Sequence, residues 1–174
     1  HLTTPAMDSL ARDGIQFKKA YCTNPVCVPS RISMATGMMP NRLGASSNAP
    51  GIEFMTLPTE VDENSLGKVV QSAGYDTFYG GKVHMSPTLS PLKAGYDEYC
   101  KDQRDELPKA CIEFMTRKRK KPFFAVASFI NPHDICFAYN ARQPDRKGTA
   151  LVDSLYQQAE MLPADQLPPL PTNS

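Results

Sequence analysis

The amino-acid sequence predicts an α/β protein with a mainly parallel sheet flanked by helices. Segments with helix signals alternate along the chain with segments of strand length, which is the order typical of a parallel sheet covered by helices. The run PFFAVASFI at residues 122–130 is almost continuously apolar, as expected for a strand that is buried on both faces. The 174 residues are 41% hydrophobic and 21% charged, which suits a globular domain with a real core.

Start and stop residues mark the expected helices. Thr4 as N-cap, Pro5 as first helical residue and Gly14 as stop predict a short helix near the N-terminus. Pro29 presets the backbone angle favoured at the first helical position and Gly37 closes the segment, so a helix is expected at residues 30–36. Further helices are expected at residues 64–73, 105–117 and 153–161.

The expected strands are residues 15–21, 75–79 and 122–130. The second is aromatic and ends in Gly80-Gly81, a pair that allows close approach of backbone to a ligand. No internal repeat interrupts this order. We therefore predict one partial domain over residues 1–161, followed by a Pro-rich loop over residues 162–174 that leads out of it. The chain opens on His1 without a methionine, and both ends are expected to be cut from a longer protein.

Composition argues against several functional classes. The formal net charge is +1, and the basic run at residues 117–121 is interpreted as a solvated face, so nucleic-acid binding is not expected. The five cysteines form no CxxC or Cys/His spacing typical of zinc. No apolar run is long enough to span a membrane.

The stretch Cys27-Val28-Pro29-Ser30-Arg31 places a potential nucleophile beside a fixed positive charge at a helix start. Free backbone N–H groups and the partial positive charge of a helix N-terminus favour an anion at Cys27. The planar fork of Arg31 suits a tetrahedral oxyanion such as sulfate or phosphate. On these residues alone, an inert apolar cysteine remains an alternative to a catalytic one.

Two polar clusters follow predicted strands, where open parallel sheets collect their ligands. If residues 82–84 are extended, Lys82 and His84 face one side and Val83 turns away. The second cluster, Asn131-Pro132-His133-Asp134, follows the apolar strand, although Asp134 equally suits a turn cap. Either cluster alone is also typical of a solvated turn. Together with Cys27 and Arg31 they predict a site that binds and transfers a small oxyanion.

These motifs resemble those of a known family. Residues 1–44, with TTPAMDSLARDGIQF and then CVPSRISMATGMMPNRLG, closely resemble the N-terminal region of the type I sulfatases, in the alkaline-phosphatase-like superfamily. The order of GGKVH and NPHD is similar too, so the resemblance extends to about residue 134. It implies an alkaline-phosphatase-like sandwich and a sulfuric ester hydrolase.

The resemblance also implies roles for particular residues. A formylglycine-generating enzyme would convert Cys27 to formylglycine, whose hydrated aldehyde is the nucleophile and a calcium ligand. Arg31 would hold the hydrate, and Lys82 and His84 would bind the sulfate group. His133 would contact the sulfate or protonate the leaving alcohol.

The chain departs from the family pattern in two respects. Val83 stands where the family usually has Trp, which we interpret as a packing change at an outward-facing position. The family's other calcium ligands, a pair of aspartates after the first strand and a downstream Asp with Asn or His, are not in this chain. The calcium site is therefore expected to be incomplete, and the isolated chain to bind calcium poorly and to be inactive.

The sequence thus predicts a sulfatase acting on a sulfated carbohydrate or aryl sulfate, with a periplasmic or secreted location implied by the family. One alternative is a phosphomonoester or phosphonate hydrolase of the same superfamily, because sulfate and phosphate are nearly isosteric. The other is a non-catalytic oxyanion-binding fragment in which Cys27 stays an ordinary thiol.

Overall fold

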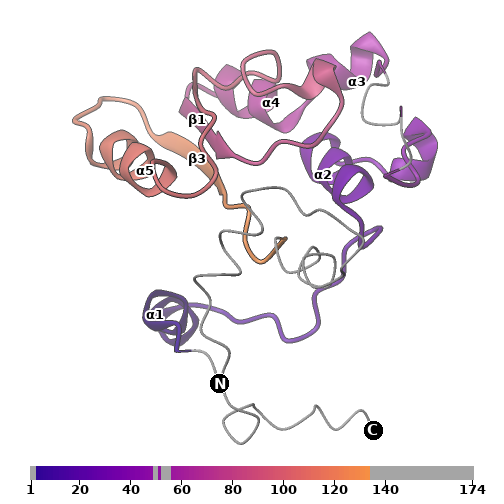
Figure 1. Ribbon diagram of the computed structural model, residues 1–174. Coiled ribbons are helices and arrows are strands. Elements are labelled where there is room, and N and C mark those ends of the chain that lie inside the picture. The colour runs from indigo at the N-terminus through magenta and orange to yellow at the C-terminus, as the bar shows by residue number, and fades with distance from the viewer. Residues whose placement is uncertain (1–2, 49–50, 52–55, 134–174) are drawn as a thin grey trace, which may run out of the picture. The chain divides into compact units, whose positions relative to one another are not determined.

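The computed structural model describes residues 3–48, 51 and 56–133 (Figure 1). Internal contacts divide the chain into two units, one made of residues 1–20 and 133–174 and the other of Tyr21–Pro132. The expected helix at residues 153–161, the Pro-rich loop at residues 162–174 and Asp134 lie outside the described residues. Among the helices that are described, none is long and apolar enough to cross a membrane.

The described part of the first unit contains helix α1, Pro5–Asp13. Its bounds confirm the prediction: Thr4 is the N-cap, Pro5 opens the helix and Gly14 ends it. The Thr4 hydroxyl donates a hydrogen bond to the Asp8 carboxylate at 2.9 Å. No residue of α1 is buried, so these local signals specify the helix without help from a described core.

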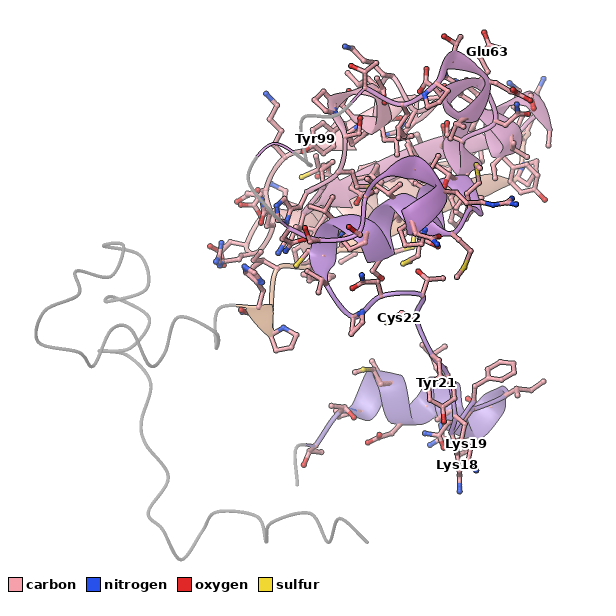
Figure 2. The ribbon with its side chains drawn as sticks, turned by 90° about the vertical axis from the view of Figure 1, so that its right-hand side faces the viewer. Lys18, Lys19, Tyr21, Cys22, Glu63 and Tyr99 are labelled. Atoms are coloured by element: carbon pink, nitrogen blue, oxygen red, sulfur yellow. The ribbon has the colours of Figure 1, made fainter. Side chains whose placement is uncertain are left out.

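The predicted strand at residues 15–21 is wrong. The segment has no strand structure, and Ile15, Phe17 and Tyr21 are 84%, 79% and 89% exposed. Figure 2 shows the side chains of Lys18, Lys19 and Tyr21 along it. A strand needs a neighbour for its backbone hydrogen bonds, and this segment pairs with no described strand.

The second unit is built on a parallel sheet, as predicted. Its strands are β1 (Asp76–Gly81), β2 (Glu98–Cys100) and β3 (Phe123–Ser128), in the order β2-β1-β3. Both pairings are parallel, and the register sets Gly81 opposite Ser128. The carboxyl ends of β1 and β3 therefore meet at one edge of the sheet.

Strand β1 runs through the glycine pair that was expected to follow it. A Cβ on Gly80 would lie 2.3 Å from a methyl carbon of Leu107, and one on Gly81 would lie 2.1 Å from the Ser128 carbonyl oxygen. The glycines thus allow close approach of neighbouring protein atoms, whereas the sequence suggested close approach of a ligand. Because neither glycine has a side chain, α5 and β3 can pack closely against β1.

Strand β3 is less buried than its apolar sequence predicts. Phe124 and Val126 pack against one core cluster and Ala125 against the other, but Phe123 is 41% exposed and no residue of the strand is fully buried. The reason is its place at the edge of the described sheet, where only β1 pairs with it. The apolar composition of residues 122–130 predicted a strand correctly, but the predicted burial of that strand on both faces is wrong.

The three longer helices of this unit are α2 (Cys27–Thr36), α4 (Leu66–Ser72) and α5 (Leu107–Thr116). Their existence was predicted, but α2 begins at Cys27, three residues before the expected start. The Ser30 N–H donates to the Val26 carbonyl at 3.1 Å, and this hydrogen bond closes the first turn, in which Pro29 lies. Proline is tolerated there because amides of the first turn lack partners within the helix.

Four short elements gave no periodic signal in the sequence: η1 (Pro40–Leu43), α3 (Thr59–Glu63), η3 (Pro87–Leu89) and strand β2.

In Figure 1, α4 and α5 lie to either side of β1 and β3. The larger core cluster joins α2 to Tyr79 of β1, and the smaller one packs Leu107, Cys111 and Phe114 of α5 against Phe78. This layering places the start of α2 near the carboxyl ends of the strands.

Candidate anion site at the start of helix α2

Cys27 is the first residue of α2 and is half-buried. The backbone donors expected around it are largely engaged: Val28 N–H donates to Asn48 Oδ1 at 2.8 Å, and Ser30 N–H closes the first turn. Pro29 has no N–H to offer. The positive character of the site therefore comes mainly from side chains that other parts of the fold bring to Cys27.

Lys82 is the first of these side chains. It directly follows β1, is 7% exposed, and its Nζ lies 3.8 Å from Cys27 Sγ. Its backbone is held by the end of β3, because Lys82 N–H donates to the Ser128 carbonyl at 2.8 Å. A buried ammonium is unfavourable unless a counter-charge or acceptor faces it, so this position suits a bound anion.

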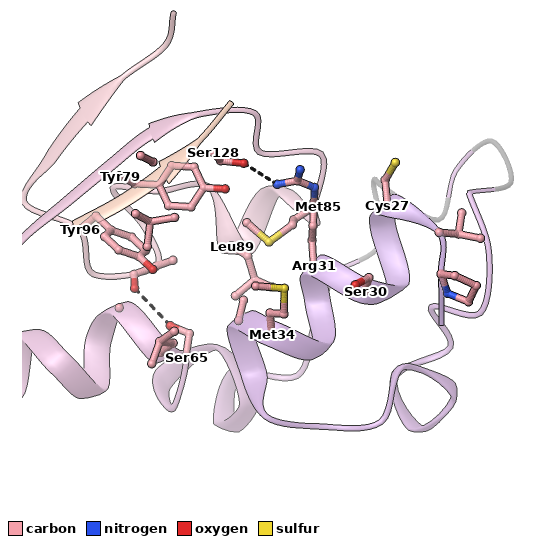
Figure 3. Close-up of a pocket in the computed structure, with 18 residues that line it drawn as sticks. Cys27, Ser30, Arg31, Met34, Ser65, Tyr79, Met85, Leu89, Tyr96 and Ser128 are labelled. Carbon is pink, nitrogen blue, oxygen red and sulfur yellow. Dashed lines mark hydrogen bonds between the residues drawn. The ribbon is translucent and has the colours of Figure 1, made fainter. Parts of the chain in front are cut away.

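Arg31 supplies the second charge. It lies four residues after Cys27 on α2, so both side chains share one face of the helix. Its Nη1 donates to the Lys82 carbonyl at 2.9 Å and to Ser128 Oγ at 2.8 Å, the latter bond being drawn in Figure 3. The guanidinium is thereby tied to the carboxyl ends of β1 and β3.

Two residues of this arrangement, Ser128 and Tyr79, were not identified from the sequence. Tyr79 donates its hydroxyl proton to the Lys82 carbonyl at 2.7 Å and is 5% exposed. Only the position of Ser128 could have indicated its role, because it is the last residue of β3, at the sheet edge where ligands collect. Small polar residues and tyrosines are too common at such positions to be singled out by type.

His84 is not placed as predicted. Its φ of 42° lies in the left-handed region, so residues 82–84 are not extended and the two-residue alternation does not apply. His84 is exposed, and Val83, expected to face outward, is half-buried and packs against the larger core cluster. Binding of sulfate by His84 remains a prediction, as does the role of His133, which belongs to the other unit.

A pocket of about 470 Å³ adjoins Cys27 and Arg31 (Figure 3). Most of its wall is apolar or aromatic, and the residues that form this wall include Met34, Tyr79, Met85, Leu89, Tyr96 and Val126. Burial, with a smaller contribution from Tyr79, raises the pKa of Tyr96 to about 12. Tyr96 is neutral at physiological pH, and Arg31 carries the charge among the described residues that line the pocket.

Calcium does not fit the residues that the structure describes. They contain no group of three or more His, Cys, Asp or Glu side chains able to hold a metal ion. The charged neighbour of Cys27 is the Lys82 ammonium, which repels a dication, whereas calcium wants six or more oxygen ligands. The four described cysteines are free thiols, and Cys136 lies outside the described residues.

The arrangement can bind a small oxyanion next to residue 27. An ammonium and an anchored guanidinium converge at the carboxyl ends of two parallel strands, with a pocket alongside for the rest of a ligand. Fold and site together define an α/β protein with a cationic site around a cysteine at a helix start.

Comparison with known proteins identifies the family. The family model described as Sulfatase matches residues 1–159, and the chain belongs to the sulfatase family. The recognition made from the Cys27 motif is thus confirmed. The predicted fold class, a parallel sheet flanked by helices, is also confirmed.

Two curated relatives illustrate the similarity. The Delta 4,5-hexuronate-2-O-sulfatase of Bacteroides thetaiotaomicron is 30% identical over 146 residues, which are 76% of this chain and 30% of the relative. The Ulvan-active sulfatase of Formosa agariphila is 31% identical over 133 residues, which are 75% of this chain and 25% of the relative. The chain thus spans less than a third of the length of each.

A solved structure shares the fold. The crystal structure of Ps i-CgsB in complex with k-i-k-neocarrahexaose superimposes with a TM-score of 0.64 at 24% sequence identity. The match covers 82% of this chain and 44% of that chain. At this identity the likeness shows the fold alone.

Proposed function

We propose that the protein hydrolyses sulfate esters of carbohydrates through a formylglycine made from Cys27. The observation that carries the proposal is the position of Lys82 Nζ, 3.8 Å from Cys27 Sγ, in a chain of the sulfatase family. The sulfur stands where the aldehyde hydrate would project. The carbohydrate preference is supported by the names of the hexuronate and ulvan relatives.

Formylglycine would supply a hydrated aldehyde, in which one hydroxyl loses its proton and attacks sulfur as the alcohol is displaced. The second hydroxyl would then lose its proton as the carbonyl reforms and the C–O bond to sulfate breaks, and a water molecule would restore the hydrate. Lys82 neutralises charge that builds on the sulfate oxygens. Arg31, anchored through Nη1, uses its remaining N–H donors to orient the hydroxyl groups at residue 27 and to bind an oxygen of the sulfate group. The S–O bond breaks, and the alcohol leaves with a proton.

In the same proposal a histidine provides that proton. An imidazole near neutral pKa donates efficiently to a leaving oxygen. We assign the donation to His133 and a sulfate contact to His84, by similarity of NPHD and GGKVH to the family motifs. Calcium is generally implied for the sulfatase family, and its ligands other than residue 27 would lie outside the residues that the structure describes.

Mass spectrometry and parallel rate measurements test the proposal. The full-length gene product that carries this chain is expressed in a host able to install formylglycine, and the peptide spanning Cys27 is weighed. We expect the formylglycine mass and faster turnover of an aryl sulfate than of the matching aryl phosphate, with Cys27→Ala inactive toward both. An unmodified thiol would refute the proposed nucleophile, and faster phosphate hydrolysis would favour a phosphomonoester hydrolase.

A further inference from the structure

Two adjacent strands join in holding one guanidinium. Ser128 ends β3 and Gly81 ends β1, and the two residues are opposite each other in the register. Lys82 follows Gly81, so its carbonyl oxygen and Ser128 Oγ lie at the same sheet edge, and Arg31 Nη1 donates to both. The hydrogen bond from Arg31 to Ser128 joins residues 97 positions apart in the sequence.

Both of these hydrogen bonds start from the same nitrogen of Arg31. Within the described residues Nε and Nη2 make no hydrogen bond, and Arg31 lines the pocket. A guanidinium carries five N–H donors in a rigid plane, so fixing Nη1 fixes the direction of the other three donors. Those donors remain for a ligand or for the group formed at residue 27.

The Lys82 carbonyl is itself fixed. It accepts the Tyr79 hydroxyl at 2.7 Å as well as Arg31 Nη1 at 2.9 Å, and these two donors match its two lone pairs. Tyr79 is held in turn by edge contacts with Tyr96 and Tyr99, at ring-centroid distances of 5.2 and 6.2 Å. The acceptor therefore has little freedom to follow a moving arginine.

We propose that Ser128 and Tyr79 are positioning residues of the sulfate site, Ser128 by anchoring Arg31 directly and Tyr79 through the Lys82 carbonyl. Arginine has several rotatable bonds, and without an anchor it loses the alignment that paired hydrogen bonds to an oxyanion require. The inference rests on the proposed function, since it assigns these residues to the same site.

Inorganic sulfate is the probe that tests the inference without depending on turnover. Its affinity for the full-length gene product is measured by calorimetry in Ser128→Ala, Ser128→Thr and Tyr79→Phe variants, each also made in an Arg31→Lys background. Lysine keeps the charge, so sulfate binding stays measurable, but it has no fork to align. Tyr99→Phe is the matched control, because Tyr99 lies in the same aromatic cluster and its hydroxyl bonds no described residue.

We expect Ser128→Ala to weaken sulfate binding about tenfold, as for loss of a hydrogen bond to a charged group, and Ser128→Thr to restore it. Tyr79→Phe should weaken binding by about threefold, since it acts through a neutral acceptor, and Tyr99→Phe should change nothing. In the Arg31→Lys background the Ser128→Ala effect should shrink below about twofold.

An equal loss in both backgrounds would overturn the inference, because a general structural effect does not depend on the guanidinium. Lack of sulfate binding by the unaltered protein, or failure of Ser128→Thr to restore affinity, would overturn it as well. Sulfate binding with the expected coupling but no turnover of sulfate esters would refute the proposed function and leave the positioning roles standing.

Discussion

At the scale of single residues, the site depends on where charges are placed more than on which charges are present. Lys82 is one of 19 lysines and arginines, yet it is 7% exposed and lies 3.8 Å from Cys27 Sγ. Lys93, by contrast, is exposed on the loop after η3. Burial removes competing water, so an anion gains far more from Lys82 than from a solvated lysine.

Replacing Lys82 tests this difference. We expect Lys82→Met in the full-length gene product to lower kcat/KM for an aryl sulfate about a hundredfold, as for loss of one donor to a developing oxyanion. Stability in urea should hold or rise, since the variant removes a buried charge. Lys93→Met is the control and should retain full activity. A loss below about threefold at Lys82 would contradict direct contact with the sulfate group.

At the scale of elements, the site depends on how closely the ends of β1 and β3 approach. Gly81 has a φ of 92°, and an added Cβ would lie 2.1 Å from the Ser128 carbonyl oxygen, the acceptor for Lys82 N–H. The hydrogen bond from Lys82 N–H to the Ser128 carbonyl holds the backbones of both residues in place. The glycine pair thus acts on the site through backbone packing.

Alanine substitution separates this packing from the conformational freedom of glycine. Gly81→Ala should destabilise the protein by about 3 kcal/mol or more, because φ strain adds to a backbone clash. Gly74→Ala is the matched control: its φ is 89°, but no atom lies within 4 Å of the added Cβ, so only about 1 kcal/mol is expected. Equal urea midpoints for the two variants would rule out the clash.

At the scale of the whole molecule, the unit Tyr21–Pro132 is held together by contacts distant in sequence that the site does not use. Asp97 accepts hydrogen bonds from Thr77 N–H and Thr77 Oγ1, both at 2.9 Å, and from Gln71 Nε2 at 2.6 Å. The Asp97 carboxylate thus ties α4 to the start of β1 and to the turn before β2. Desolvation raises the Asp97 pKa, but the Thr77 and Gln71 donors outweigh it and hold the pKa below its usual value.

A lowered carboxylate pKa makes stability depend on pH with a definite sign. The contribution of Asp97 is complete above its unfolded-state pKa and is lost as the pH falls through the lower folded-state pKa. We expect the urea midpoint of the full-length gene product to fall on acidification, and to fall less in Asp97→Asn, which is less stable at neutral pH. Parallel pH curves for the two proteins would show that Asp97 contributes nothing to the acid sensitivity.

Local chemistry made much of the fold predictable. Thr4, Pro5 and Gly14 mark the bounds of α1 correctly because helix starts and stops depend on residues that are neighbours in the sequence. The parallel sheet followed from the alternation of helix and strand patterns. The strand expected at residues 15–21 failed because pairing, which no local pattern contains, decides whether an extended segment becomes a strand.

The sequence by itself determined the family, the residue types of the anion site and the order in which they occur, because the Cys27 motif and the two later clusters are local and distinctive. Only the tertiary structure decided that Lys82 lies next to Cys27 and that the His84 backbone is not extended. It also decided that Arg31 bonds Ser128 and the Lys82 carbonyl, which accepts the Tyr79 hydroxyl as well. These outcomes depend on strand register and on close backbone approach at glycines, which bring together residues that no sequence spacing relates.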